Sequence, residues 1–213
     1  TTLFRSVQPF VFTEMLVTNG RGKISGVAIK GIDPARAAET LDLDRHMVKG
    51  KVADLAAGEK PGAPGVVAPI IIGQELAKKL GVDVGSDIRV VIPVAASELE
   101  ASNLRVPTPR TRSYRVAGIF YSGFEEYDKR LMYVGLHEGQ ALLARGNLVT
   151  GVELKVRDVD EAKRVGDKLR RALRELDRGF DFDVKDWFEL NRPLFKAVRT
   201  QKIVMMIVMT VIV

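Results

Sequence analysis

The sequence predicts a mixed fold, α/β or α+β, with a mixed sheet and two subdomains. Residues 152–156 alternate apolar and charged side chains, as in a half-buried strand. Residues 162–176 then repeat apolar side chains at helical spacing, with charges on the other face. Alternation returns over 180–184, which completes a β-α-β unit. Shorter strand and helix patterns precede this unit along the chain.

The N-terminal region predicts a hairpin followed by a short helix. Residues 7–17 and 24–29 are apolar and β-leaning, and a glycine-bearing turn separates them. Asp33 is placed to cap a helix over 35–41, with Pro34 at its first position.

The middle of the chain predicts short alternating elements. Residues 48–64 are rich in Gly, Ala, Pro and Lys and indicate a loop. A buried strand is expected over 66–72, then a helix over 74–80 that Gly81 ends, and a turn before the strand 88–92. A strand over 131–134 and a helix over 138–144 complete this part.

A long connection is expected between the strand 88–92 and the next strand, 114–121. Residues 93–113 contain three prolines and little periodicity. Because proline removes a donor from the backbone ladder, this segment should project from the sheet as a loop or ribbon.

The C-terminal residues indicate a membrane environment. An amphipathic helix is expected over 186–198, with Pro193 marking a kink or a restart. Residues 203–213 carry no charge, and a spanning helix needs about 20 such residues. We expect the first half of a spanning helix here; the alternative is a buried C-terminal strand or helix. The first ten residues do not form a secretory signal, and we expect a piece of a larger membrane protein.

Composition narrows the chemistry. The 213 residues include no cysteine, which excludes disulfides, thiolate metal sites and a cysteine nucleophile. The net charge of +6 allows an acidic partner, a membrane surface or nucleic acid. Only Tyr114 accompanies the basic residues Arg105, Arg110, Arg112 and Arg115, which argues against nucleic acid.

No motif indicates an active site. The two histidines, His46 and His137, lie in unrelated contexts, and no nucleophile elbow is present. The glycines of 81–85 follow a helix and precede a strand, so we interpret them as turn residues. The acidic residues Glu125, Glu126 and Asp128 could bind a cation, but a solvated acidic loop is the simpler interpretation. The sequence therefore predicts an interaction domain and not an enzyme.

Several segments, in this order, resemble the extracytoplasmic domain of the LolC/LolE family. This family comprises permease subunits of the lipoprotein-releasing ABC transporter, related in architecture to MacB. The matching segments are Gly31-Ile32-Asp33-Pro34, 72–82, Val84-Gly85, 114–120, Val149-Thr150-Gly151, Asp186-Trp187 and Leu194-Phe195.

The resemblance implies an α+β, MacB-like periplasmic domain. Its membrane-proximal β-α-β (Porter-like) part would comprise 1–41 and 150–191. A mixed α/β (Sabre-like) subdomain carrying a projecting hairpin would be inserted over 42–149, and 192–213 would lead into a truncated transmembrane segment.

The resemblance also implies a hook, a hairpin that captures a periplasmic lipoprotein carrier of the LolA type. The hook would be the segment 93–109, with Arg89, Pro109 and Arg110 at its base. The sequence lacks the Pro-Met pair of the family tip, and Pro109 replaces a polar base residue. The implied carrier-binding residues of the hook are Pro93, Leu99, Glu100, Ala101, Ser102, Asn103, Leu104, Arg105, Val106 and Pro107.

Further partners follow from the resemblance. They are a second permease subunit, a cytoplasmic ATPase that would hydrolyse ATP, an acylated lipoprotein substrate and the inner membrane; no cofactor, metal or nucleic acid is expected. The main alternative is a MacB- or FtsX-like mechanotransmission domain with a different periplasmic partner. A small-molecule sensor domain is a third class, and it would require a closed apolar pocket.

Overall fold

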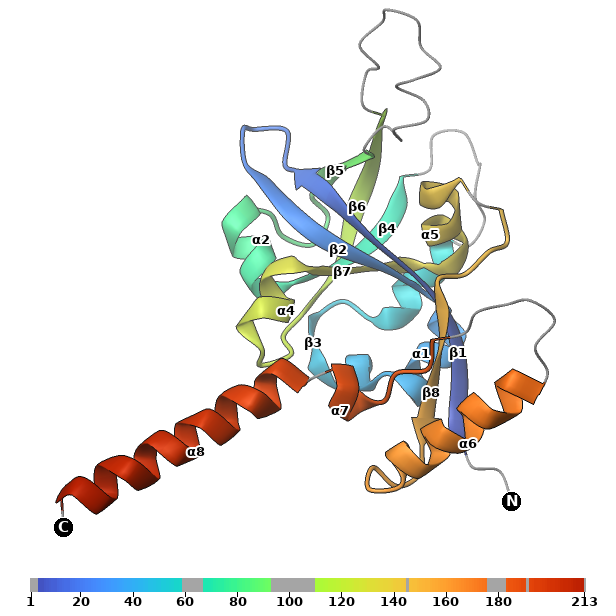
Figure 1. The fold of residues 1–213 in the computed structure, drawn as a ribbon. Helices are drawn as coiled ribbons and strands as arrows, with labels where there is room; N and C mark the ends of the chain where they lie inside the picture. The colour runs from blue at the N-terminus through green and yellow to red at the C-terminus, as the bar shows by residue number, and fades with distance from the viewer. Residues whose placement is uncertain are drawn as a thin grey trace, which may run out of the picture. The chain divides into compact units, whose positions relative to one another are not determined.

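The computed structural model describes residues 4–58, 67–92, 110–144, 146–175, 183–190 and 192–212 (Figure 1). The chain divides into two compact units, Ser6–Lys155 and a second unit formed by Thr1–Arg5 with Val156–Val213. The strands and helices in them confirm the mixed fold. The division into membrane-proximal and inserted subdomains stays a prediction.

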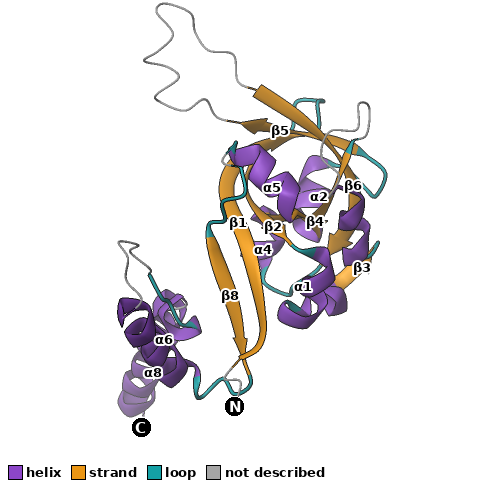
Figure 2. Cartoon of the chain, turned by 90° about the vertical axis from the view of Figure 1, so that its right-hand side faces the viewer, coloured by secondary structure: helices purple, strands orange, loops and turns teal. Residues whose placement is uncertain are grey.

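A mixed sheet forms the larger unit, and it closes on itself. Its order is β2-β7-β4-β6-β5-β1-β8, and β1 additionally pairs with β2. The strands β2, β7, β4, β6, β5 and β1 therefore form a closed ring, while β8 lies beside β1 (Figure 2). The strands are β1 (Phe4–Thr18), β2 (Ile24–Ile32), β3 (Met47–Lys49), β4 (Ala68–Gly73), β5 (Asp87–Ile92), β6 (Arg110–Phe120), β7 (Leu131–Gly135) and β8 (Gly151–Val156).

Short helices connect these strands. The hairpin of β1 and β2 is confirmed, as are the caps of α1 (Pro34–Thr40) and α2 (Gln74–Leu80). The Asp33 carboxylate accepts from the Ala35 N–H at 3.0 Å, and Gly81 ends α2 at a φ of 69°. The other helices of this unit are α4 (Glu125–Arg130), α5 (Leu136–Leu143) and the 3₁₀ helices η1 (Asp42–His46) and η2 (Val52–Gly58).

Two apolar clusters stabilise the larger unit. One gathers buried side chains from the ring strands, α2 and α5, among them Ile29, Ile88 and Val134. The other joins α1, η1 and η2 to the strands through Ile32, Leu55 and other buried residues. Each large apolar side chain that is fully buried contributes about 1.5–3 kcal/mol, so these clusters dominate the stability.

Four expectations about local structure are corrected. The expected loop at 48–64 contains part of β3 and all of η2 within its described residues. β6 begins at Arg110, so residues 110–113 belong to a strand. The acidic residues 125–128 lie in α4 and not in a loop. Val184, expected in a returning strand, lies in no strand, and 180–182 are outside the described residues.

The second unit contains three described helices, α6 (Ala162–Glu175), α7 (Trp187–Leu190) and α8 (Arg192–Ile212). Because α8 begins at Arg192, Pro193 lies in its first turn and marks a restart. The apolar residues 203–209 are helical and exposed, so the alternative of a buried C-terminal element is wrong. None of the described helices combines the length and apolar character needed to cross a membrane.

Candidate functional site

The hook segment 93–109 lies outside the described residues, together with all of its expected contact residues and Pro109. Its two ends are defined by the strands that flank it. Ile92 at the end of β5 and Arg110 at the start of β6 are register partners in an antiparallel pair. The hook segment therefore connects neighbouring antiparallel strands. We call the paired residues 87–92 and 110–115 the β5–β6 ribbon.

The structure places Arg89 and Arg110 on opposite faces of the β5–β6 ribbon. Directly opposed residues of an antiparallel pair share a face, and faces alternate along each strand. Arg89 opposes Ser113, whereas Arg110 opposes Ile92 and is in phase with the buried Tyr114. Both arginines are exposed. They do not form one patch on one face, although both flank the hook segment.

An ion pair fixes the outer face of the ribbon at the end away from the hook segment. The Arg115 Nε and Nη2 donate to the two Asp87 carboxylate oxygens at 2.9 and 3.2 Å. The hydrogen bond from Arg115 holds the pKa of Asp87 below its ordinary value. Arg89 lies on the same outer face of β5, between this ion pair and the hook segment.

A buried carboxylate fixes the inner face. Glu138, in the first turn of α5, is 1% exposed. Its Oε1 accepts from the Tyr114 hydroxyl at 2.6 Å and lies 2.7 Å from the Arg112 Nε. Its Oε2 accepts from the Arg112 Nη2 at 2.8 Å. Burial raises the pKa of Tyr114, so its hydroxyl stays protonated and donates. A buried carboxylate requires such partners, and this one ties α5 to β6 two residues from Arg110.

The helix that carries Glu138 is itself closely packed. Gly139 of α5 crosses Gly31 of β2, and a Cβ added at Gly139 would lie 3.1 Å from the Gly31 Cα. Leu142 of the same helix is buried in the main apolar cluster. The contacts therefore run without interruption from Arg112 through Glu138 and α5 to β2.

Other residues of the resemblance occupy positions of close approach. A Cβ added at Gly73 would lie 2.2 Å from the Asp128 carbonyl oxygen, and one at Gly151 would lie 2.9 Å from the Phe10 ring. The Thr150 hydroxyl accepts from the Phe12 N–H at 3.0 Å, and the Thr150 N–H donates to the Phe10 carbonyl at 2.9 Å. The segments 72–82 and 149–151 thus hold α4 and β1 in place.

The chain is similar to known transport proteins, although no family model matches it. It is 30% identical over 205 residues to the lipoprotein-releasing system transmembrane protein LolC of Neisseria meningitidis serogroup B. It is 29% identical over 205 residues to LolC of Xylella fastidiosa. Both matches cover 96% of this chain and 45% of the relative. The resemblance to the LolC/LolE family is confirmed. The chain spans about half the length of these relatives.

Two solved structures share the fold of this chain. The periplasmic region of MacB from Actinobacillus actinomycetemcomitans aligns with a TM-score of 0.55 at 13% identity, covering 91% of this chain and 77% of that one. The extracellular domain of the ABC-type transporter YknZ from Gram-positive bacteria aligns with a TM-score of 0.51 at 16% identity, covering 82% and 76%. The fold of this LolC-like chain is therefore MacB-like.

Sequence reasoning missed the residue that anchors the ribbon in this LolC-like chain. A glutamate in the first turn of a helix is ordinarily explained by the helix dipole. Glu138 and Arg112 are 26 positions apart, and no local pattern joins them.

Among the described residues, no group of three or more His, Asp or Glu side chains could hold a metal ion.

Proposed function

We propose that this chain is the periplasmic domain of an ABC transporter permease that releases lipoproteins from the inner membrane. In this role it recruits a LolA-like carrier through the hook segment 93–109 and the β5–β6 ribbon. The observation that carries the proposal is the similarity to LolC over 96% of the chain. The ribbon supports it because its ends, Ile92 and Arg110, are register partners, and Arg112, two residues from Arg110, is bound by the buried Glu138 of α5.

The rest of the transporter belongs to the proposal. A second permease subunit completes the membrane path, and a separate cytoplasmic ATPase hydrolyses ATP, so that this chain is not itself an enzyme. An acyl chain that leaves the bilayer loses about 0.8 kcal/mol of stabilisation for each CH₂ group. A carrier held beside the permease offsets this loss as soon as the lipoprotein leaves the membrane.

Carrier binding measured by calorimetry or pull-down tests the proposal. The variants are Arg89→Ala, Arg110→Ala, their combination, and a deletion of residues 99–104. We expect each arginine substitution to weaken binding about 3–10-fold, and the deletion to abolish it, because charged contacts at an interface rim contribute modestly. Arg21→Ala, an exposed arginine in the β1–β2 turn, is the matched control and should leave affinity unchanged. Unaltered binding in both the double variant and the deletion would remove the hook assignment.

The alternative function is a MacB- or FtsX-like mechanotransmission domain that binds a different periplasmic partner. The MacB-like fold is the observation that favours it. The same experiment separates the two functions, because a mechanotransmission domain of this kind would not bind the carrier at all.

A further inference from the structure

The outer face of the β5–β6 ribbon continues across β1 onto β2. Directly opposed residues of β5, β1 and β2 form two rows, with Val91, Leu16 and Gly26 in one row and Arg89, Thr18 and Ile24 in the other. Directly opposed residues of antiparallel strands share a face, and so do residues two positions apart along a strand. All six residues therefore lie on one side of the sheet, and we call them the outer-face patch.

The outer-face patch exposes aliphatic side chains that the core does not require. Leu16 and Ile24 are 49% and 61% exposed, and they are diagonal neighbours on paired strands, roughly 7–8 Å apart. The opposite face of the same hairpin is already apolar and buried, since Val17 and Val27 are 0% and 1% exposed. Nothing lies within 4 Å of a Cβ added at Gly26, so the space above this residue is open. Neighbouring apolar side chains on a solvated sheet face indicate a binding surface.

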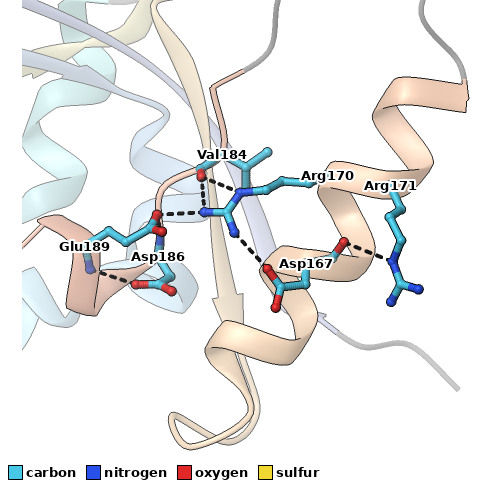
Figure 3. A network of polar contacts seen from close by, with 6 residues as sticks. All are labelled: Asp167, Arg170, Arg171, Val184, Asp186 and Glu189. Atoms are coloured by element: carbon cyan, nitrogen blue, oxygen red, sulfur yellow. Dashed lines mark hydrogen bonds and ion pairs between the residues drawn. The ribbon is translucent and has the colours of Figure 1, made fainter.

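Arg89 supplies a cation at the β5 edge of the outer-face patch. It is exposed, and no side chain in the described part of the chain forms an ion pair with it. Arg170 of the second unit, by contrast, is bound within the structure. It donates to the Val184 carbonyl at 2.6 Å, and to the Asp167 and Glu189 carboxylates at 2.9 and 2.7 Å (Figure 3). The Arg89 guanidinium therefore keeps its donors for a partner.

We propose that the outer-face patch binds the apolar rim of the acyl-chain carrier that the hook segment recruits. The inference rests on the proposed function and extends its binding surface. A specific protein interface buries about 800 Å² on each partner, and the side chains of Arg89 and Arg110 supply only a fraction of that area. A carrier seated against the base of the hook therefore extends onto neighbouring surface. Strands lie about 4.8 Å apart, so Leu16 and Ile24 are within roughly 12 Å of Val91.

Chemistry and position favour the carrier over other occupants. A protein that accepts an acyl chain must open an apolar cavity at its surface, because the chain favours an apolar environment throughout the transfer. The rim of such a cavity complements aliphatic residues beside a single cation, whereas an acidic soluble partner would require more cations. The inner face of the ribbon is occupied by α5, where Glu138 binds Arg112, while Leu16 and Ile24 on the outer face are exposed. A second copy of this chain would gain nothing from the position beside the hook.

Calorimetry with the purified LolA-like carrier tests the outer-face patch. Leu16→Ser with Ile24→Ser should weaken binding about tenfold, because two aliphatic side chains lose their apolar contact with the carrier. The control is Val48→Ser with Leu148→Ser, which changes aliphatic residues of 51% and 65% exposure outside the patch and should alter the affinity less than about twofold. Gly26→Gln fills the open space without removing a core contact, and it should weaken binding about 3–10-fold. Urea denaturation verifies that each variant folds.

A photoreactive residue at position 24 should form a crosslink with the carrier, and one at position 48 should not. Deletion of residues 99–104 separates this inference from the proposed function. If the deletion leaves carrier binding unaltered, the hook assignment itself fails. If the deletion abolishes binding while the Leu16/Ile24 variant retains wild-type affinity within about twofold, only the outer-face patch is overturned. Sedimentation detects the other occupant, because weaker self-association of this variant with unchanged carrier affinity would assign the patch to a second copy of the chain.

Discussion

Removal of the Glu138 carboxylate should destabilise the larger unit strongly. In Glu138→Ala, the buried Tyr114 hydroxyl loses its acceptor, and an unpaired buried hydroxyl costs about 1–3 kcal/mol. Arg112 also loses its hydrogen bond and its ion pair with the carboxylate. Breaking a fully buried ion pair costs about 3–5 kcal/mol, but the Arg112 side chain is 36% exposed and regains water. Together these effects predict a loss of about 3 kcal/mol in the free energy of unfolding.

Urea denaturation measures this loss, and a double-mutant cycle tests its origin. Tyr114→Phe alone removes one hydroxyl and should cost about 1–2 kcal/mol. In the Glu138→Ala background it should cost about 1 kcal/mol less, because the acceptor is already absent. Hydrogen exchange of the β6 amides near Arg112 should accelerate in Glu138→Ala. A loss below about 0.5 kcal/mol, or full additivity with Tyr114→Phe, would refute the assignment of Glu138 as the anchor of the ribbon.

Two further predictions concern packing and pH. Gly73→Ala should lower the free energy of unfolding, measured by urea denaturation, by about 2–4 kcal/mol, because the added Cβ would lie 2.2 Å from a backbone oxygen of α4. Gly26→Ala is the control, because nothing lies within 4 Å of its added Cβ. This variant should leave the free energy of unfolding nearly unchanged. NMR titration should find the pKa of Asp87 below its ordinary value, and Arg115→Gln should raise it, since the Arg115 hydrogen bond is the main cause. The stabilisation from this pair is present above the unfolded-state pKa and is lost as pH falls through the folded-state pKa. An Asp87 midpoint that Arg115→Gln does not move would contradict this origin.

Features specified by neighbouring residues could be predicted from the sequence. The hairpin of β1 and β2, the Asp33 cap and the glycine end of α2 each depend on a few consecutive positions. The loop expected around η2 was wrong because its composition is rich in small residues, while Val52 and Leu55 are buried by distant strands. Composition predicts only the local conformational preference of a segment, whereas the burial of Val52 and Leu55 depends on tertiary contacts.

Contacts between distant parts of the chain could not be predicted in this way. The closed ring depends on β1 pairing with both β2 and β5, and β1 also pairs with β8 outside the ring. One strand pattern does not specify three neighbours. The acidic residues of α4 were assigned to a loop for a related reason. Asp128 is buried, and its Oδ1 accepts from the Ser122 N–H and hydroxyl, both at 2.8 Å. The pattern of apolar and polar residues along the chain did not predict this contact.

The placement of Arg89 and Arg110 restricts how a carrier can use the ribbon. The two residues were assigned to one hook base, yet the register directs them to opposite faces. A carrier that contacts both must therefore enclose the ribbon from two sides. Such contacts share no partner, and their free energies should add within about 0.5 kcal/mol in the double variant. A carrier that approaches only the outer face would depend on Arg89 and remain insensitive to Arg110→Ala. Glu138 holds Arg112 on the inner face of the ribbon. Loss of the Glu138 carboxylate should therefore lower the affinity of a carrier that contacts both faces more than that of a carrier bound only at Arg89.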